Sequence, residues 1–174
     1  MDEGAALYSR YLDGDESAFD ELIRLYRKDV TAYANSITRN FSLAEDAAID
    51  AFSELIYKKG RYNFSIPFKS FLFIICRRRA IDKVRRESRF VPLSDAAKSD
   101  EDIFEKAEND EKREMLGFAV KKLPEKQRSA VYFVYYEGLS YAETAKIMKI
   151  SPKKVDNLIF QAKKSLKEEL KNKI

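Results

Sequence analysis

The stretch Ser140–Leu166, SYAETAKIMKISPKKVDNLIFQAKKSL, carries start signals for two short helices joined by a tight turn. Ser140 can cap the first helix through its hydroxyl, while Glu143, three residues on, reaches back to the Ser140 amide in a capping box. Ser151 is a second N-cap candidate, and Pro152 suits the first position of a new helix, where a missing amide hydrogen costs nothing. A turn this short makes the two helices cross steeply. The stretch therefore predicts a helix-turn-helix.

The second helix of this motif has one apolar and one polar face. Its apolar residues recur at helical spacing and predict a buried stripe: Val155, Leu158, Ile159, Ala162 and Leu166. The outward positions are Lys153, Lys154, Asp156, Asn157, Phe160, Gln161 and Lys164. Amides can pair with adenine edges, a carboxylate can accept from the cytosine amino group, a phenyl ring can contact a thymine methyl group, and lysines bind phosphate. This face predicts binding to duplex DNA, and the alternative is an ordinary helical hairpin with a solvated face.

Composition narrows the class of protein. The 174 residues are 45% apolar and 36% charged, which is typical of a foldable chain. No apolar run has the length of a membrane span and the acidic start does not resemble a secretory signal, so we expect a cytoplasmic protein without membrane insertion. The single cysteine, Cys76, lies in an apolar run and is expected to be a small buried hydrophobe. With one cysteine and no histidine, the chain can build neither a zinc finger nor a histidine general base. We expect no catalytic residues, no metal site and no cofactor.

Charge is unevenly distributed along the chain, although the net charge is only +4. Residues 61–92 hold 9 basic and 2 acidic side chains, whereas residues 93–114 hold 4 basic and 9 acidic ones. Residues 153–174 are basic again, with 7 basic against 3 acidic side chains. Basic stretches bind nucleic acid by releasing condensed counterions, so the pattern predicts two separate nucleic-acid surfaces.

The apolar periodicity is helical, with no strand or hairpin signal. We therefore predict an all-α fold of two small helical bundles joined by an acidic linker, the C-terminal bundle containing the helix-turn-helix. We expect domains at residues 1–90 and 113–174 and the linker at 91–112. Helices are expected over 5–12, from 17 onward, from a capping box at Ser42 and Glu45 to about Lys59, over 68–87, and over 125–137 with Tyr135 facing inward.

Five short motifs stand in order along the chain: GDESAFDEL (Gly14–Leu22), AEDAAIDAF (Ala44–Phe52), FLFIICRRRAIDKVRR (Phe71–Arg86), LPEKQR (Leu123–Arg128) and GLSYAE (Gly138–Glu143). Together they resemble the bacterial sigma-70 family, in its compact extracytoplasmic-function (ECF) type. The second motif resembles the helix that docks on the polymerase clamp, and the third resembles the helix that opens and reads the -10 element. The last two resemble the entry to the domain that reads the -35 element.

The resemblance implies a transcription initiation factor that binds core RNA polymerase at its clamp and flap and directs it to promoter DNA, both duplex and melted. It implies polymerase binding by Asp46, Ile49 and Asp50. Because rings and guanidinium groups suit unstacked bases, it implies -10 recognition by Phe64, Arg77, Arg78, Arg85 and Arg86. The seven outward residues of the second helix would read the -35 element. An anti-sigma factor is a further partner that the resemblance allows.

The chain departs from the family pattern at several positions. Arg78 stands where the family usually has Asn, Ile49 where it often has Gln, and Phe71 where it usually has Trp. Asp156 and Gln161 stand where basic residues are common. The sequence therefore predicts the class of protein and leaves its promoter sequence unassigned.

Two other classes of protein fit parts of the sequence. A stand-alone helix-turn-helix regulator would use the first bundle as a sensor or dimerisation module, which seldom needs the basic run at residues 77–89. A recombinase or nuclease would need acidic residues at metal-ligand spacing or a histidine, and the sequence has neither. The initiation factor is the interpretation that uses both basic stretches.

Overall fold

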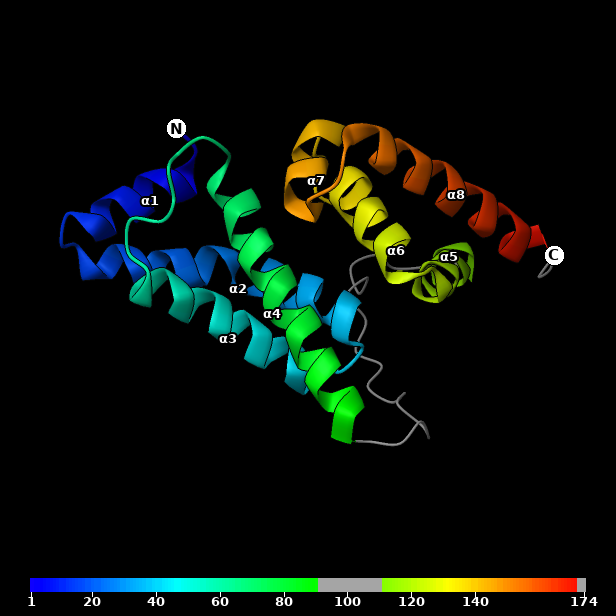
Figure 1. Cartoon of the computed structure of the whole chain (residues 1–174), viewed down its shortest axis with the longest axis horizontal. Coiled ribbons are helices and arrows are strands. Elements are labelled where there is room, and N and C mark those ends of the chain that lie inside the picture. The colour runs from blue at the N-terminus through cyan, green and yellow to red at the C-terminus, as the bar shows by residue number, and fades with distance from the viewer. Residues whose placement is uncertain (91–110, 172–174) are drawn as a thin grey trace. The chain divides into compact units, whose positions relative to one another are not determined.

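The computed structural model describes residues 1–90 and 111–171, and no strand occurs within these ranges (Figure 1). The chain divides into two compact units, Met1–Ser99 and Asp100–Ile174, here called unit 1 and unit 2. The all-α prediction is confirmed. Within the described ranges, no helix is both long and apolar enough to cross a membrane. The acidic linker predicted at residues 91–112 lies outside the described residues, except for its last two positions, which begin a helix.

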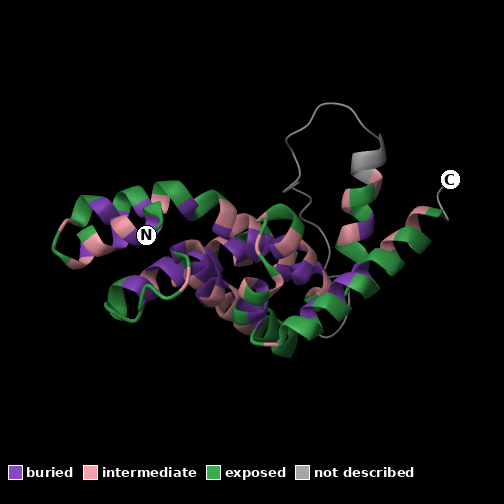
Figure 2. Cartoon of the chain, turned by 90° about the horizontal axis from the view of Figure 1, so that it is seen from above, coloured by how far each residue is buried: buried purple, intermediate pink, exposed green. Residues whose placement is uncertain are grey.

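Unit 1 is a helical bundle in which the second helix is central. Its elements are α1 (Glu3–Leu12), α2 (Glu16–Thr38), α3 (Phe41–Tyr57) and α4 (Phe68–Phe90). The other three helices all pack on α2, and α3 also packs on α4. Apolar side chains three and four residues apart form the inward faces, as with Leu22, Tyr26, Val30 and Tyr33 of α2. Figure 2 shows these buried faces.

Asp2 joins the first turn of α1 to the first turn of α4. Its Oδ1 accepts a hydrogen bond from the Ala5 amide at 2.9 Å, and its Oδ2 accepts one from the Phe68 amide at 3.0 Å. One carboxylate therefore satisfies unpaired donors at two helix N-termini and complements both helix dipoles. Gly4 permits this close approach, because a Cβ there would lie 2.8 Å from the Phe68 ring and nearer still to the hydroxyl of Tyr26.

A buried carboxylate holds α3 to α4. The side chain of Glu54, in α3, is only 2% exposed. Four cationic side chains donate hydrogen bonds to it: Lys58 (3.2 Å), Arg61 (3.2 Å), Arg79 (2.7 Å) and Arg78. One turn earlier in α3, Asp50 pairs with Lys83 of α4 at 3.0 Å. Acidic residues four apart on α3 thus face basic residues four apart on α4, as expected for two helices that run side by side.

Unit 2 contains α5 (Glu111–Lys122), α6 (Glu125–Val131), the π-helix η1 (Tyr132–Tyr136), α7 (Tyr141–Met148) and α8 (Pro152–Lys171). The long helix α8 packs against α5, α6 and α7. The predicted capping box is present: the Glu143 amide donates to Ser140 Oγ at 3.2 Å, and the Ser140 amide donates to Glu143 Oε2 at 2.9 Å. Ser151 Oγ accepts from the Lys154 amide at 3.2 Å. The helix-turn-helix prediction is confirmed.

The predicted capping box at Ser42 and Glu45 is wrong. The helix begins earlier, and its cap is Asn40, whose Oδ1 accepts from the Leu43 amide at 3.2 Å. The preceding helix ends at Arg39 in the left-handed conformation (φ 52°), so the chain reverses there and leaves Asn40 in an extended conformation. Asn in that conformation is among the strongest N-caps, and Ser42 lies inside the helix.

The helix predicted over residues 125–137 is not α-helical to its end. In η1 the Glu137 amide donates to the Tyr132 carbonyl, five residues back, at 3.0 Å. The wider turn changes which side chains face the core. Tyr135, predicted to face inward, is therefore exposed, whereas Tyr132 and Phe133 are buried. The helix α4 also continues three residues past its predicted end, because no glycine or proline interrupts it before Phe90.

The Glu54 cluster should make the stability of unit 1 depend on pH. Burial raises the pKa of Glu54, but hydrogen bonds from Arg78, Arg79 and Lys58 lower it by more, so the pKa falls from 4.5 to about 2. Because the folded-state pKa is the lower one, this stabilisation is complete above pH 4.5 and is lost as the pH falls through about 2. The shift corresponds to about 3 kcal/mol of unfolding free energy.

Urea unfolding of the full chain, followed by circular dichroism at several pH values, tests this expectation against Glu54→Gln. A protonated Glu resembles Gln, so the difference in unfolding free energy between wild type and variant should shrink toward zero near pH 2. A difference that is the same at pH 7 and near pH 2 would show that the Glu54 charge does not stabilise the fold.

Candidate nucleic-acid and protein interfaces

The exposed face of α8 collects the residues predicted to read duplex DNA. All seven are exposed, and Phe160 is 70% exposed. Six of them follow helical spacing along one face: Lys153, Asp156, Asn157, Phe160, Gln161 and Lys164. The opposite side of α8 carries the predicted apolar stripe, of which Val155, Leu158, Ile159 and Ala162 are buried. The face can therefore enter a groove without disturbing the core.

Two contacts shape the edges of this face. Gln127 of α6 donates from Nε2 to Gln161 Oε1 at 3.4 Å. This hydrogen bond from a neighbouring helix orients the Gln161 amide group. Lys163 lies over the ring of Tyr135, with its Nζ 5.4 Å from the ring centroid. Sequence reasoning missed Tyr135, because an α-helical register would have buried it. The structure places it beside α8.

The basic half of α4 carries four of the residues predicted to contact the -10 element. Arg85 and Arg86 are exposed, and Arg85 pairs with Asp82 at 3.5 Å. Arg77 and Arg78 are partly buried. Since an α-helix rises about 1.5 Å per residue, the run from Arg77 to Arg86 is about 14 Å long, the length of roughly four base steps. The surface is long enough for several nucleotides.

Arg78 is held by the protein and not only presented to solvent. Its Nη2 donates to both carboxylate oxygens of Glu54, and its side chain is 41% exposed. Arg79 shares the same carboxylate through Nε and Nη2. Sequence reasoning did not find Glu54. The available signal is its place on the apolar stripe of α3, between Ala51 and Leu55.

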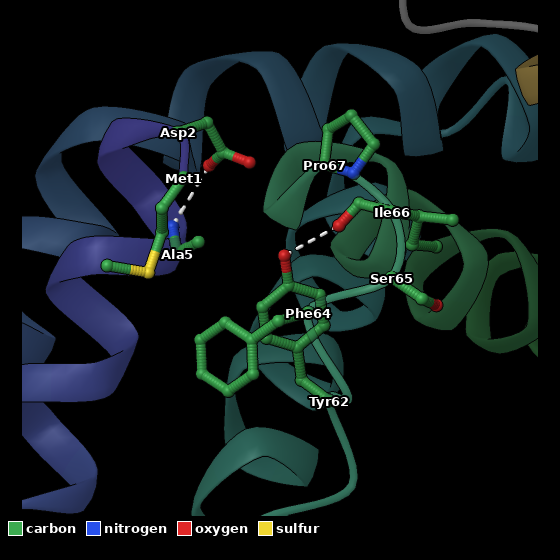
Figure 3. Close-up of a pocket in the computed structure, with 8 residues that line it drawn as sticks. All are labelled: Met1, Asp2, Ala5, Tyr62, Phe64, Ser65, Ile66 and Pro67. Atoms are coloured by element: carbon green, nitrogen blue, oxygen red, sulfur yellow. Dashed lines mark hydrogen bonds between the residues drawn. The ribbon is translucent and has the colours of Figure 1, made fainter.

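Phe64, the fifth residue predicted to contact the -10 element, lies in the loop before α4. Its backbone is left-handed (φ 57°), its ring is 44% exposed, and the ring centroid lies 4.6 Å from that of Tyr62. Figure 3 shows both rings beside a hollow whose other wall is the start of α1, including Met1 and Ala5. Tyr62 Oη donates to the Ile66 carbonyl at 2.6 Å, and burial raises the pKa of Tyr62 to about 12, so the phenol stays neutral.

The face of α3 predicted to bind polymerase is exposed at two of its three residues. Asp46 is exposed and Ile49 is 57% exposed. Asp50 shares its charge with Lys83, so it is less available to a partner. Ile56, two turns beyond Ile49, is also exposed and extends the apolar surface. Ile56 could have been identified in the sequence, because residues seven positions apart lie on the same face of an α-helix.

Cys76 is fully buried, as predicted, and its Sγ donates to the Val30 carbonyl at 3.6 Å. Burial raises the pKa of this thiol to about 12, which keeps it protonated and unreactive. Among the described side chains, no group of three or more acidic or sulfur ligands is arranged to hold a metal ion.

Two sequence families match the chain. The family described as Sigma-70 region 2 matches residues 22–90, and the family described as Sigma-70, region 4 matches residues 113–166. The first match includes α3, the loop and α4, and the second includes the helix-turn-helix. Every candidate interface described above lies within one of them.

Relatives are similar over most of their length. ECF RNA polymerase sigma factor SigM of Bacillus subtilis is 30% identical over 151 residues, which cover 85% of this chain and 92% of that protein. RNA polymerase sigma-H factor of Pseudomonas aeruginosa is 25% identical over 183 residues, which cover 98% of this chain and 95% of that protein.

Solved structures share the fold. CnrH, in complex with the cytosolic domain of CnrY, gives a TM-score of 0.72 at 20% identity and covers 98% of this chain and 99% of that chain. RpoE of Bartonella quintana, in complex with the anti-sigma factor NepR, gives 0.70 at 22% identity and covers 88% of this chain and 96% of that chain. The similarity to SigM and the matches to regions 2 and 4 together place this chain in the ECF type of the sigma-70 family of RNA polymerase sigma factors.

Proposed function

We propose that unit 1 binds core RNA polymerase and the melted -10 strand, while α8 of unit 2 reads the -35 element as duplex. Family membership makes the chain a transcription initiation factor, not an enzyme, that directs RNA polymerase to promoters. The alternative of a stand-alone regulator is not favoured, because unit 1 carries Sigma-70 region 2 in place of a sensor module. We place its action in the cytoplasm, where polymerase and chromosome meet.

The -10 assignment is supported by the basic side of α4 and by Phe64 in the loop that precedes this helix. Arginine and aromatic side chains can stack on unpaired bases, and one stacked base contributes about 1 to 3 kcal/mol. Arg85 and Arg86 are exposed, so they can contact the sugar-phosphate backbone of the DNA strand. Arg78 is fixed by Glu54 and still partly exposed, so it can contact a base without first being ordered.

Run-off transcription tests the function. Core RNA polymerase of the same organism, mixed with this chain and a pool of genomic fragments, should give discrete transcripts that core enzyme alone does not give. Permanganate should then modify thymines in the melted region. Arg78→Ala should reduce that reactivity about tenfold, whereas Arg24→Ala, an exposed arginine of α2, should not. Transcripts that do not depend on this chain would contradict the function, and normal reactivity in Arg78→Ala would contradict only the role of Arg78.

The polymerase-binding assignment is supported by an apolar residue flanked by acidic ones on α3. Ile49 is 57% exposed on α3, and the exposed Ile56 lies two turns farther along, so a partner can cover both apolar side chains. Asp46 is exposed one turn away and Asp50 follows Ile49. A basic surface on the polymerase clamp would complement this group. An anti-sigma factor as a further partner stays a prediction.

Asp46→Lys should weaken binding to core polymerase about tenfold or more, because reversing a charge places like charges together in the interface. Asp50→Lys tests the interface less cleanly, since it also breaks the pair with Lys83. Co-purification with core enzyme and a titration of labelled chain measure the effect. Asp20→Lys, an exposed residue of α2 with the same charge change, serves as the control. Equal affinities of the Asp46 and Asp20 variants, with unchanged helicity, would refute the assignment.

The -35 assignment is supported by the polar groups at the N-terminal turns of α8, the part of a recognition helix that meets base edges. Asn157 and Gln161 carry amides suited to adenine, and Lys153 and Lys164 lie where they can bind phosphate. Asp156 could accept from a cytosine amino group or could repel misplaced phosphate. We therefore propose Asn157 and Gln161 as base readers and the two lysines as positioning residues.

Asn157→Ala should cost about 1 to 3 kcal/mol on the preferred -35 duplex and relax the preference at one base pair. Lys153→Ala should weaken binding to all duplexes alike and reduce the salt slope by about one. Binding to duplexes varied one base pair at a time, at two salt concentrations, separates these outcomes. Ser165→Ala, an exposed change outside the reading face of α8, is the control. If both variants lose the same factor on every duplex, α8 does not read sequence.

A further inference from the structure

Glu54 differs from the other acidic residues that pair with cations of α4. Asp29 pairs with Lys69 and Asp50 pairs with Lys83, and their side chains are 34% and 44% exposed. The Glu54 side chain is 2% exposed. It therefore interacts almost entirely with protein groups, and those groups are all cationic side chains.

The four cations come from three elements that meet at the proposed -10 surface. Lys58 follows α3, Arg61 lies in the loop that carries Phe64, and Arg78 and Arg79 lie in α4. Their side chains are between 34% and 54% exposed, so each has one side on Glu54 and another in solvent. One negative charge stands against four positive charges, so the cluster remains attractive to nucleic acid.

A carboxylate and a phosphate present similar oxygens to a guanidinium group. The N–H donors that bind Glu54 therefore cannot bind the phosphates of DNA at the same time. Without Glu54 they would bind phosphate in DNA of any sequence. Contacts to phosphate give affinity without sequence information, and contacts to bases give specificity. An internal carboxylate at this place reduces the number of contacts to phosphate. It also fixes the orientation of the side chains that contact bases.

We infer that Glu54 is a specificity-determining residue of the -10 surface: it occupies guanidinium donors that would otherwise bind any phosphate, and it holds Arg78 and Arg79 in the orientation that contacts bases. This inference rests on the proposed function of that surface. The rival explanation is that Glu54 only fastens α3 to α4. Both explanations expect Glu54→Gln to be less stable, but only the specificity role expects it to bind random DNA more tightly.

The first experiment measures binding of the full chain to a fluorescein-labelled single-stranded 20-mer of random sequence over a salt series. Glu54→Gln should bind about fivefold more tightly at 0.1 M salt, with a salt slope steeper by about 0.7, as expected for one additional phosphate contact. Glu21→Gln makes the same change in net charge, at an exposed residue of α2 that pairs with Arg10, and should leave both values unchanged. Circular dichroism confirms that each variant is folded.

The second experiment measures specificity in the holoenzyme. Core polymerase with each variant transcribes a template whose -10 region is randomised, and the transcribed sequences are counted. Glu54→Gln should show a weaker base preference than wild type and Glu21→Gln. If Glu54→Gln does not fold, Glu54→Asp replaces it: the charge stays but reaches fewer donors, so the same changes should appear in smaller size.

The outcomes distinguish a failure of the proposed function from a failure of the inference about Glu54. If wild type gives no promoter-directed transcript, the proposed function fails. If wild type is active and the folded Glu54 variant keeps the wild-type salt slope and base preference, or binds random DNA more weakly, the inference about Glu54 is overturned and Glu54 only fastens the helices.

Discussion

A charged group that is buried away from water must be compensated by the groups around it. In unit 1 the buried charged group is the Glu54 carboxylate. Donors from the C-cap of α3, the following loop and α4 together compensate it. The helix α3 also carries the proposed polymerase-binding face, and α4 carries the proposed melted-strand surface. The ion cluster that closes their interface therefore fixes both surfaces relative to each other. One turn away, the pair between Asp50 and Lys83 extends the same alignment.

Unit 2 separates stability from recognition more completely. Its core takes the apolar side of α8, and a capping box and a serine N-cap, at Ser140 and Ser151, fix the start of each helix of the motif. None of these groups lies on the reading face, so side chains such as Asn157 can change without unfolding the unit. In unit 1, by contrast, Arg78 serves both the fold and the proposed contact with DNA. Substitutions there carry a cost in stability that substitutions on the α8 face avoid.

The features that the sequence predicted correctly depend on residues a few positions apart. The capping box at Ser140 and the apolar stripe of α8 are of this kind. Asn40 was missed because its capping role depends on the left-handed turn at Arg39 before it, and Tyr135 was misplaced because nothing local signals a π-helix. Glu54 and Arg78 are 24 residues apart, and glutamate is usually exposed, so only the packed structure could reveal their contact.

The same contact explains a departure from the family pattern. Arg78 stands where the family pattern usually has Asn, and a neutral amide would leave Glu54 with three cationic donors instead of four. With Glu54 present, the fold constrains the residue at position 78, in addition to the proposed contact with DNA. An arginine satisfies both demands, since its planar group can bind a carboxylate on one edge and keep other donors for a ligand. The base preference of a relative with Asn at this position cannot be transferred to this chain, because asparagine lacks the guanidinium group that Glu54 holds here.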